Sequence, residues 1–197
     1  MAFHGARLDR ANMFEAILIG ADLSRTTMDG ANLSSVKMDR AKASGALFRG
    51  VTFLTTAADA NFEGADLSRS SGYLIAPGAD MRHAIIRRAR LAPDLSNQPM
   101  GMLHTVLARA NLEGADLSLS DLSLADLGYA DFRTSLVRWT NFHGADLSAA
   151  DFTGADVTGA NFAQADLSDT VFVHVRGRST MRGLKAARNL DRAIFRR

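Results

Sequence analysis

The chain has 197 residues, with 23 Lys and Arg against 21 Asp and Glu, and it contains no cysteine. This length suits one domain with a sizeable core, and the missing thiols exclude disulfides, thiolate metal sites and a cysteine nucleophile. Because no signal peptide opens the chain and no apolar run reaches the roughly 18 to 20 residues of a membrane span, we expect a cytoplasmic protein.

From its first residues to residue 53, the chain places an apolar residue at every fifth position. The series is Phe3, Leu8, Met13, Leu18, Leu23, Met28, Leu33, Met38, Ala43, Phe48 and Phe53. A small residue usually stands two positions before each, as Ala21 does, and Gly often stands two after, as Gly20 does. A period of five fits neither a helix nor a strand. It does fit a chain that turns a corner every five residues, so that four sides close a square coil.

The period is interrupted at three places, near residues 54–61, 72–80 and 92–106. Each interruption requires either a bulged corner or a loop that leaves the coil. The third is the best candidate for a loop, because its prolines cannot donate hydrogen bonds to a ladder and its Asn and Gly suit turns. Loops on rigid scaffolds often carry binding function, although a tolerated insertion explains this one equally well. The candidate loop residues are Pro93, Asn97, Pro99, Met100 and Gly101.

From Leu112 to Phe172 the same period runs through thirteen positions without a slip. Stacking the coils at twenty residues predicts four interior columns. They are Leu112/Phe132/Phe152/Phe172, Leu117/Val137/Val157, Leu122/Phe142/Phe162 and Leu127/Leu147/Leu167. Like side chains thus stack on like, which is typical of a continuous ladder core.

Several stretches repeat one short motif. They include GADLS at 20–24, GANLS at 30–34, GADLS at 64–68 and 114–118, and ADLSAADFTGADV at 145–157. In these stretches the chain resembles the pentapeptide-repeat family, whose consensus is A(D/N)LXX. The resemblance implies an all-β fold, a right-handed quadrilateral parallel β-helix, over residues 1–172, with residues 173–197 as a separate basic segment.

Residues 110–170 carry ten acidic and two basic side chains. Most of the acids directly precede an apolar core position, so they point outward, and those twenty residues apart form columns. Each Asp has an ordinary role in bonding its own turn, but like charges stacked at strand spacing cost free energy. The columns are therefore also a candidate surface for a partner. Their members are Asp116, Asp126, Asp131, Asp146, Asp151, Asp156 and Asp166.

Four large side chains stand two positions after a core residue, where the chain faces outward. They are Leu119, Leu124, Tyr129 and Trp139. As a cluster they are a candidate apolar contact patch, and the alternative is that they lie flat over the corners.

The segment 173–197 carries eight basic residues and one acidic residue. An open end of a solenoid needs a cover, so we expect this segment to be a cap or a dimerisation segment. Two structures remain open: a short basic helix, or a repeat that restarts at Leu190 and Phe195. Direct binding of nucleic acid by this segment is disfavoured by the acidic region beside it.

The sequence shows no constellation for catalysis. Its five histidines are scattered, and it contains no HExxH, no GxGxxG and no phosphate loop. We therefore expect no enzymatic activity, no cofactor, no metal and no small-molecule substrate.

The resemblance implies a more specific function. Some pentapeptide-repeat proteins are similar to duplex DNA in width and charge, occupy the DNA-binding saddle of DNA gyrase and protect it from quinolones. The interruptions and the distinct C-terminal segment are similar to that subgroup, whereas the basic tail and near-neutral N-terminal part are not. The expected function is a protein-binding solenoid, with gyrase or topoisomerase IV as the most concrete partner and a homodimer formed through one rod end. A scaffold or targeting module of a larger assembly is the alternative.

Overall fold

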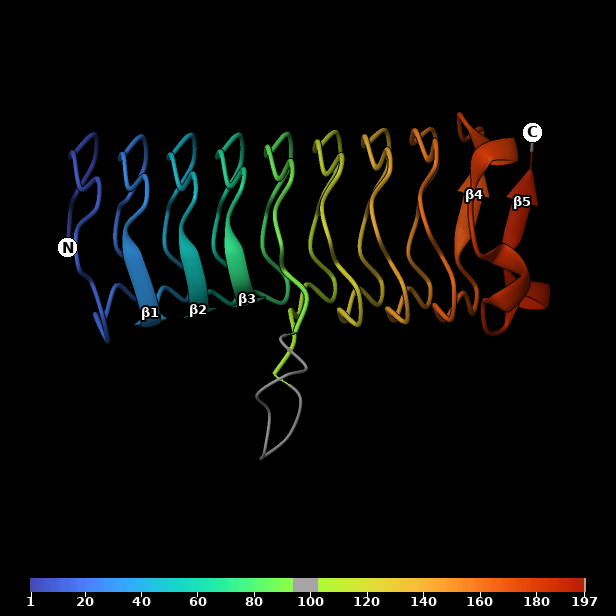
Figure 1. The fold of residues 1–197 in the computed structure, drawn as a ribbon. Helices are drawn as coiled ribbons and strands as arrows, with labels where there is room; N and C mark the ends of the chain where they lie inside the picture. The colour runs from blue at the N-terminus through green and yellow to red at the C-terminus, as the bar shows by residue number, and fades with distance from the viewer. Residues whose placement is uncertain (94–102, 197) are drawn as a thin grey trace.

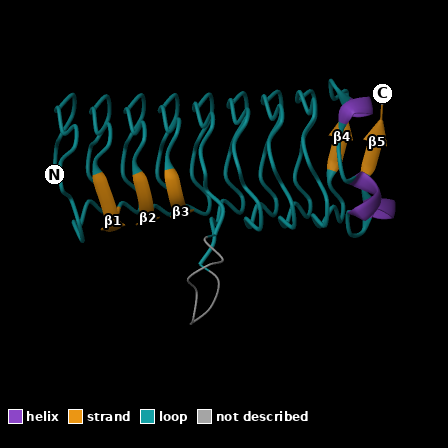
Figure 2. Cartoon of the chain, viewed as in Figure 1, coloured by secondary structure: helices purple, strands orange, loops and turns teal. Residues whose placement is uncertain are grey.

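The computed structural model describes residues 1–93 and 103–196, which form a rod of stacked coils (Figure 1). Successive coils join through parallel bridges, for example from Ala2 to Asp22 and from Asp22 to Lys42. The Phe3 N–H donates to the Asp22 carbonyl oxygen at 2.7 Å, and the Asp22 N–H donates back to the Met1 carbonyl oxygen at 2.9 Å. Most of the chain alternates single bridges with turns (Figure 2). The predicted quadrilateral parallel β-helix is confirmed.

Four ladders run along the rod, and each defines one face. The first face contains Ala2, Asp22, Lys42, Asn61, Asp80, Asn111, Asp131, Asp151, Val171 and Ile194. The second face contains Arg7, Thr27, Leu47, Asp66, Ile85, Asp116, Leu136, Asp156 and Arg176. The third face contains Asn12, Asn32, Thr52, Ser71, Arg90, Asp121, Asn141, Asn161 and Arg182. The fourth face contains Ile17, Lys37, Thr56, Ile75, Val106, Asp126, Asp146, Asp166 and Arg188.

The core is the stack of apolar side chains enclosed by these faces. The rings of Phe132 and Phe152 lie parallel with centroids 4.6 Å apart, and Phe172 continues the stack 5.1 Å beyond Phe152. Phe142 meets Phe152 edge to face at 5.9 Å. All of these side chains are fully buried. The interior columns predicted from the twenty-residue spacing are present, and their offset and edge-to-face geometries are those that aromatic pairs prefer.

The first two interruptions contain strands. Strand β1 (Asn32–Lys37), strand β2 (Thr52–Thr56) and strand β3 (Ser71–Ile75) form one parallel sheet. At each interruption the coil is one residue short. After Phe53, for example, the next core position of the period is Ala57, only four positions on. We infer that four residues are too few for the usual turn, so the chain crosses this side in extended form. Neither interruption contains an extruded loop.

At the third interruption, the described chain leaves the ladder after Leu91. The chain re-enters at Val106, which pairs with Ile75 on one side and Asp126 on the other. The Thr105 hydroxyl closes the base of the loop by donating to the Leu91 carbonyl oxygen at 2.7 Å. Of the candidate loop residues, Pro93 is described; the other four, Asn97, Pro99, Met100 and Gly101, lie outside the described residues.

The C-terminal segment builds one more coil, which has longer sides. Strand β5 (Ile194–Arg196) pairs with strand β4 (Val171–Val173), and Phe195 stacks on Phe172 at 4.9 Å. Between them lie three short 3-10 turns: η1 (Arg178–Thr180), η2 (Leu184–Ala186) and η3 (Leu190–Arg192). The ladder residues Arg176, Arg182, Arg188 and Ile194 recur every six positions. The segment therefore resumes the coil, and no α-helix occurs in the part of the chain that the structure describes.

No helix among the described residues is long and apolar enough to cross a membrane.

Candidate functional site

The aspartates of the ladders are first of all part of the scaffold. In each of the seven candidate aspartates, Oδ1 accepts a hydrogen bond from the backbone N–H two residues ahead. The distance is 3.1 Å from Gly128 to Asp126 and 2.9 Å from Ser148 to Asp146. This local bond satisfies a corner amide. It leaves the second carboxylate oxygen available for other contacts.

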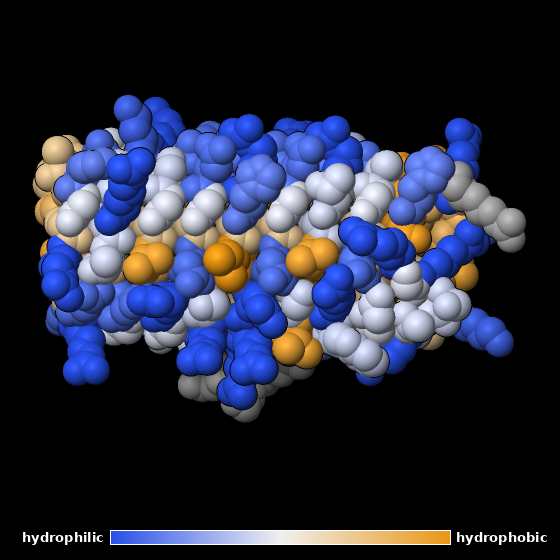
Figure 3. All heavy atoms as spheres, turned by 90° about the horizontal axis from the view of Figure 1, so that it is seen from above, coloured by the Kyte–Doolittle hydropathy of each residue, from blue (hydrophilic) through white to orange (hydrophobic). Residues whose placement is uncertain are grey.

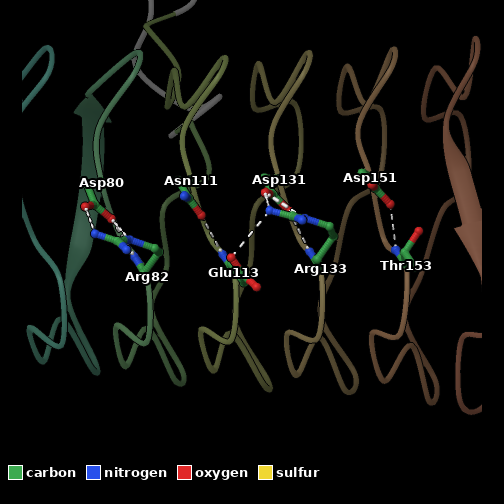
Figure 4. A network of polar contacts seen from close by, with 8 residues as sticks. All are labelled: Asp80, Arg82, Asn111, Glu113, Asp131, Arg133, Asp151 and Thr153. Carbon is green, nitrogen blue, oxygen red and sulfur yellow. Dashed lines mark hydrogen bonds and ion pairs between the residues drawn. The ribbon is translucent and has the colours of Figure 1, made fainter.

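On the first face, arginines neutralise the carboxylates of Asp80 and Asp131. Arg133 reaches Asp131 at 2.6 Å and Glu113 of the preceding coil at 3.4 Å (Figure 4). Burial alone would raise the pKa of Asp131, but the hydrogen bonds and charge of Arg133 hold it below its ordinary value. Arg82 forms the same kind of ion pair with Asp80, with 2.6 Å between its guanidinium nitrogen and the Asp80 carboxylate oxygen. Arg82 and Arg133 therefore compensate the charges of Asp80 and Asp131, whereas Asp151, the next ladder residue, has no ion pair among the described residues.

The second face is neutralised as well. Arg138 donates from Nε to Asp156 at 2.7 Å, and Arg87 lies 3.5 Å from Asp116. The Asp156 side chain is only 8% exposed. Its burial opposes ionisation, but the hydrogen bonds from Thr158 and Arg138 lower its pKa. Neither carboxylate offers a partner an uncompensated charge.

The fourth face is different. Its ladder carries Asp126, Asp146 and Asp166 in succession, which we call the acidic column, and no basic ladder residue interrupts it before Arg188. No ion pair is found for Asp126 or Asp146 among residues 1–93 and 103–196.

At the far end of the acidic column, the carboxylate of Asp166 is better compensated. Burial opposes its ionisation, whereas hydrogen bonds from Asn189, at 2.9 Å, and from Ser168 hold its pKa below the ordinary value. The flanking residues Gly128, Ser148 and Ser168 have small side chains or none, so they leave the column uncovered.

The loop lies next to this column in the ladder. The chain returns from the loop at Val106, which bridges directly to Asp126. Tyr129 follows on the same coil and is 65% exposed, with the Arg109 guanidinium 5.9 Å from its ring centroid. The fourth face thus brings together three carboxylates, an exposed aromatic ring and the re-entry point of the loop.

The four residues of the candidate apolar patch do not meet. Leu119 and Trp139 follow the second face, whereas Leu124 follows the third and Tyr129 the fourth. Trp139 lies against Gly159 of the next coil, with the Arg182 guanidinium 5.6 Å from its ring centroid, so it partly covers a corner. In the view of Figure 3, apolar side chains form separate spots between polar ones. The structure assembles no single patch from these four residues.

Sequence reasoning missed one concave site. A cavity of about 470 Å³ is lined by Arg49, Asp66, Ser68, Arg69, Ile85, Arg87 and Arg88. We call it the arginine pocket. The available signal was the recurrence of arginine beside the same corner in neighbouring coils, nineteen residues apart at Arg69 and Arg88. The described residues contain no group of three or more His, Cys, Asp or Glu that could hold a metal.

Comparison with known proteins identifies sequences and structures that share this architecture. Pentapeptide repeats, in 8 copies, match residues 2–30, 16–53, 104–136 and 137–176. The chain is similar to HetL, a pentapeptide repeat protein involved in heterocyst differentiation regulation from the cyanobacterium Nostoc sp. strain PCC 7120. The identity is 26%, over 98% of this chain and 88% of that chain, with a TM-score of 0.59.

A second similar structure is QnrB1, a plasmid-mediated fluoroquinolone resistance protein, at 18% identity over 89% of each chain and a TM-score of 0.48. No curated protein matches the chain significantly. Since the repeat matches cover more than half of its length and the rod is built from these repeats, the chain belongs to the pentapeptide repeat family.

Proposed function

We propose that this chain is a non-enzymatic rod that binds a partner protein through its fourth face. The observation that supports this most is the acidic column, Asp126, Asp146 and Asp166, which stands in one ladder with no interleaved arginine or lysine. On the first and second faces, Asp131, Asp116 and Asp156 have arginine partners, and Asp151 is a single carboxylate without an ion pair among the described residues. The fourth face is the one where three successive ladder positions carry aspartate and none of the three forms an ion pair with the described residues.

The physical reason is repulsion along the column. Parallel ladder positions lie about 4.8 Å apart, and like charges stacked across strands destabilise a sheet. A basic surface that docks on the column relieves this repulsion, and complementary charge also speeds and orients association. The exposed ring of Tyr129 beside the column supplies an aromatic anchor of the kind enriched at binding interfaces.

The most concrete partner is DNA gyrase or another type II topoisomerase, which this rod would bind as a mimic of duplex DNA. Duplex DNA presents one charge per about 1.7 Å of helix axis, and a surface that binds it carries basic residues along a line. A narrow rod with one acidic edge has the charge pattern that such a surface accepts. The arginines paired with Asp131, Asp116 and Asp156 interrupt the negative charge of the first and second faces, so the mimicry is strongest on the fourth face.

A supercoiling assay tests this partner directly. Purified gyrase and relaxed plasmid are incubated with and without the protein, in the presence and absence of a quinolone. We expect the protein at micromolar concentration either to inhibit supercoiling or to reduce cleavage in the presence of quinolone. Unchanged supercoiling and unchanged cleavage at that concentration would exclude the topoisomerase as partner.

The second candidate function is a scaffold or regulatory module of a larger assembly. It is favoured by the similarity to HetL, which is involved in regulating a differentiation process and matches nearly the whole chain. A homodimer formed through one rod end is compatible with either function and stays a prediction. Sedimentation of the purified protein measures its oligomeric state and so tests this prediction.

A further inference from the structure

The arginine pocket is formed by three consecutive coils. The second-face ladder runs from Leu47 to Asp66 to Ile85, so the residues after them stack as well. Backbone bonds of 3.0 Å from the Gly50 N–H to the Ser68 carbonyl oxygen and of 2.9 Å from the Arg69 N–H to the Arg87 carbonyl oxygen hold the neighbouring coils in register. One row of the pocket is Arg49, Ser68 and Arg87. The next row of corner positions is Gly50, Arg69 and Arg88, of which the two arginines line the pocket.

The charges of this pocket are only partly compensated. Arg49 is paired with Asp29 of the preceding coil, and Arg87 lies 3.5 Å from Asp116 of the following coil. Asp66 accepts the Ser68 N–H at 2.9 Å. The described residues provide no ion pair to either Arg69 or Arg88. Two exposed guanidinium groups therefore stand on adjacent coils without an ion pair from the described part of the chain.

The backbone at these two positions is the one that many corners of the rod adopt. Arg69 and Arg88 have φ angles of 58° and 56°, in the left-handed region that favours glycine. At the preceding coil the same corner carries Gly50, where an added Cβ would meet nothing within 4 Å. The chain thus places arginine twice where glycine fits at less conformational cost, and it stacks two like charges about one strand spacing apart.

We infer that the arginine pocket binds a compact phosphate group, the phosphate ester or diphosphate of a small molecule. Guanidinium groups match the oxygens of phosphate with paired hydrogen bonds. Arg69 and Arg88 supply these donors, and the Ser68 hydroxyl is a further donor within the lining. A volume of about 470 Å³ lies in the range of small-molecule sites.

A compact anion fits the pocket better than an extended one. Asp66 lies within the lining, and the ion-paired carboxylates of Asp29 and Asp116 flank it on the preceding and following coils. A continuous nucleic-acid backbone that crossed the pocket would pass close to all three carboxylates. A single phosphate or diphosphate reaches Arg69 and Arg88 without doing so.

Calorimetric titration with inorganic pyrophosphate at low ionic strength tests this inference. The test variant is Arg69→Gln/Arg88→Gln, and the matched control is Arg25→Gln/Arg40→Gln. The control arginines stand at other corners with φ of 57° and, like the test pair, have no ion pair among the described residues. Glutamine is compatible with the position because Gln164 occupies it with φ of 58°.

We expect pyrophosphate to bind the native protein with one-to-one stoichiometry, the test variant to lose at least tenfold in affinity, and the control to stay within twofold. Circular dichroism melting verifies that both variants fold, and Arg88→Gln alone replaces the pair if the double variant does not. The inference would be overturned if pyrophosphate did not bind the native protein, or if the test and control variants bound it with equal affinity. It would also be overturned if titration with sodium chloride in place of pyrophosphate gave the same heat. So would a short DNA duplex that binds through these arginines more tightly than pyrophosphate.

Discussion

At the scale of single residues, the aspartate before each core position has two separable roles. Its Oδ1 accepts a backbone N–H within the same turn, which is a role that asparagine fills as well. Asn161, for example, accepts the Ala163 N–H at 3.1 Å. The turn bond does not require the negative charge of aspartate. The repeat can therefore carry either aspartate or asparagine at this position. The two roles can therefore be tested by two different substitutions of one residue.

We predict that Asp126→Ala lowers the free energy of unfolding by about 1 kcal/mol, because the Gly128 N–H loses its acceptor. Asp126→Asn keeps an acceptor oxygen at the same place and changes the stability by less than about 0.5 kcal/mol. Urea denaturation of the two variants and the native protein measures this. Equal losses in both variants would show that the charge, and not the turn bond, stabilises this corner.

The position of each aspartate was predictable from the sequence, but whether an arginine neutralises its charge was not. The twenty-residue stacking places Asp126, Asp146 and Asp166 in one column, as the structure shows. Whether a carboxylate is neutralised depends on side chains of a neighbouring coil. Arg87 pairs with Asp116 across the loop, 29 positions further on, and such a pair follows only once the length of every coil is known.

At the scale of elements, strand β3 depends on a glycine in a core position. Gly72 pairs with Phe53 of strand β2 and has a φ of 95°. A Cβ added to Gly72 would overlap the carbonyl oxygen of Phe53. The parallel sheet of β1, β2 and β3, which crosses the side where the loop later leaves, therefore requires glycine at this place.

We predict that Gly72→Ala destabilises the rod by about 3 kcal/mol, since overlap with backbone adds to the strain of a positive φ. The control is Gly20→Ala, where φ is 64° and an added Cβ meets nothing within 4 Å. That substitution costs about 1 kcal/mol from backbone strain alone. Thermal melting of both variants distinguishes them, and equal shifts in Tm would contradict the role given to Gly72.

Two elements could not be derived from a strict period of five. The short coils at β2 and β3 lack one residue each, and a deletion in a repeat looks in the sequence like the start of a loop. The terminal coil has sides of six residues, with Gly177, Gly183 and Asn189 at φ between 54° and 77°. The recurrence of Arg-Gly, Arg-Gly and Arg-Asn every six residues was the signal that would have revealed it.

At the scale of the whole molecule, charge is divided along the rod. The arginine pocket lies in the N-terminal half, and the acidic column follows the loop on another face. The basic terminal coil then stacks directly on the acidic region, where Arg176 pairs in the ladder with Asp156 and Arg188 with Asp166. The net charge of +2 conceals this division. Since the terminal coil continues the stack, its positive charge partly offsets the acidic end of the rod.

The fold was predictable because a single motif repeats almost throughout the chain. The proposed binding surface was predictable only in part, because all seven candidate aspartates satisfy the same pattern and only their contacts separate them. Those contacts leave Asp126, Asp146, Asp151 and Asp166 without an ion pair among the described residues. Three of these four, Asp126, Asp146 and Asp166, share one column, which begins beside Val106. The central claim is therefore that the acidic column on the fourth face, and not acidity in general, binds the partner.

The most direct measurement of this claim is the affinity for purified DNA gyrase at fixed salt. The test variant is Asp126→Asn/Asp146→Asn/Asp166→Asn. The control is Asp22→Asn/Asp66→Asn/Asp80→Asn, which removes the same charge from the same turn position on the first and second faces.

Both variants keep their turn bonds, so their circular dichroism spectra should match that of the native protein. We predict that the test variant binds at least tenfold more weakly while the control stays within twofold. Equal affinity of the test variant and the native protein, or an equal loss in both variants, would contradict the claim.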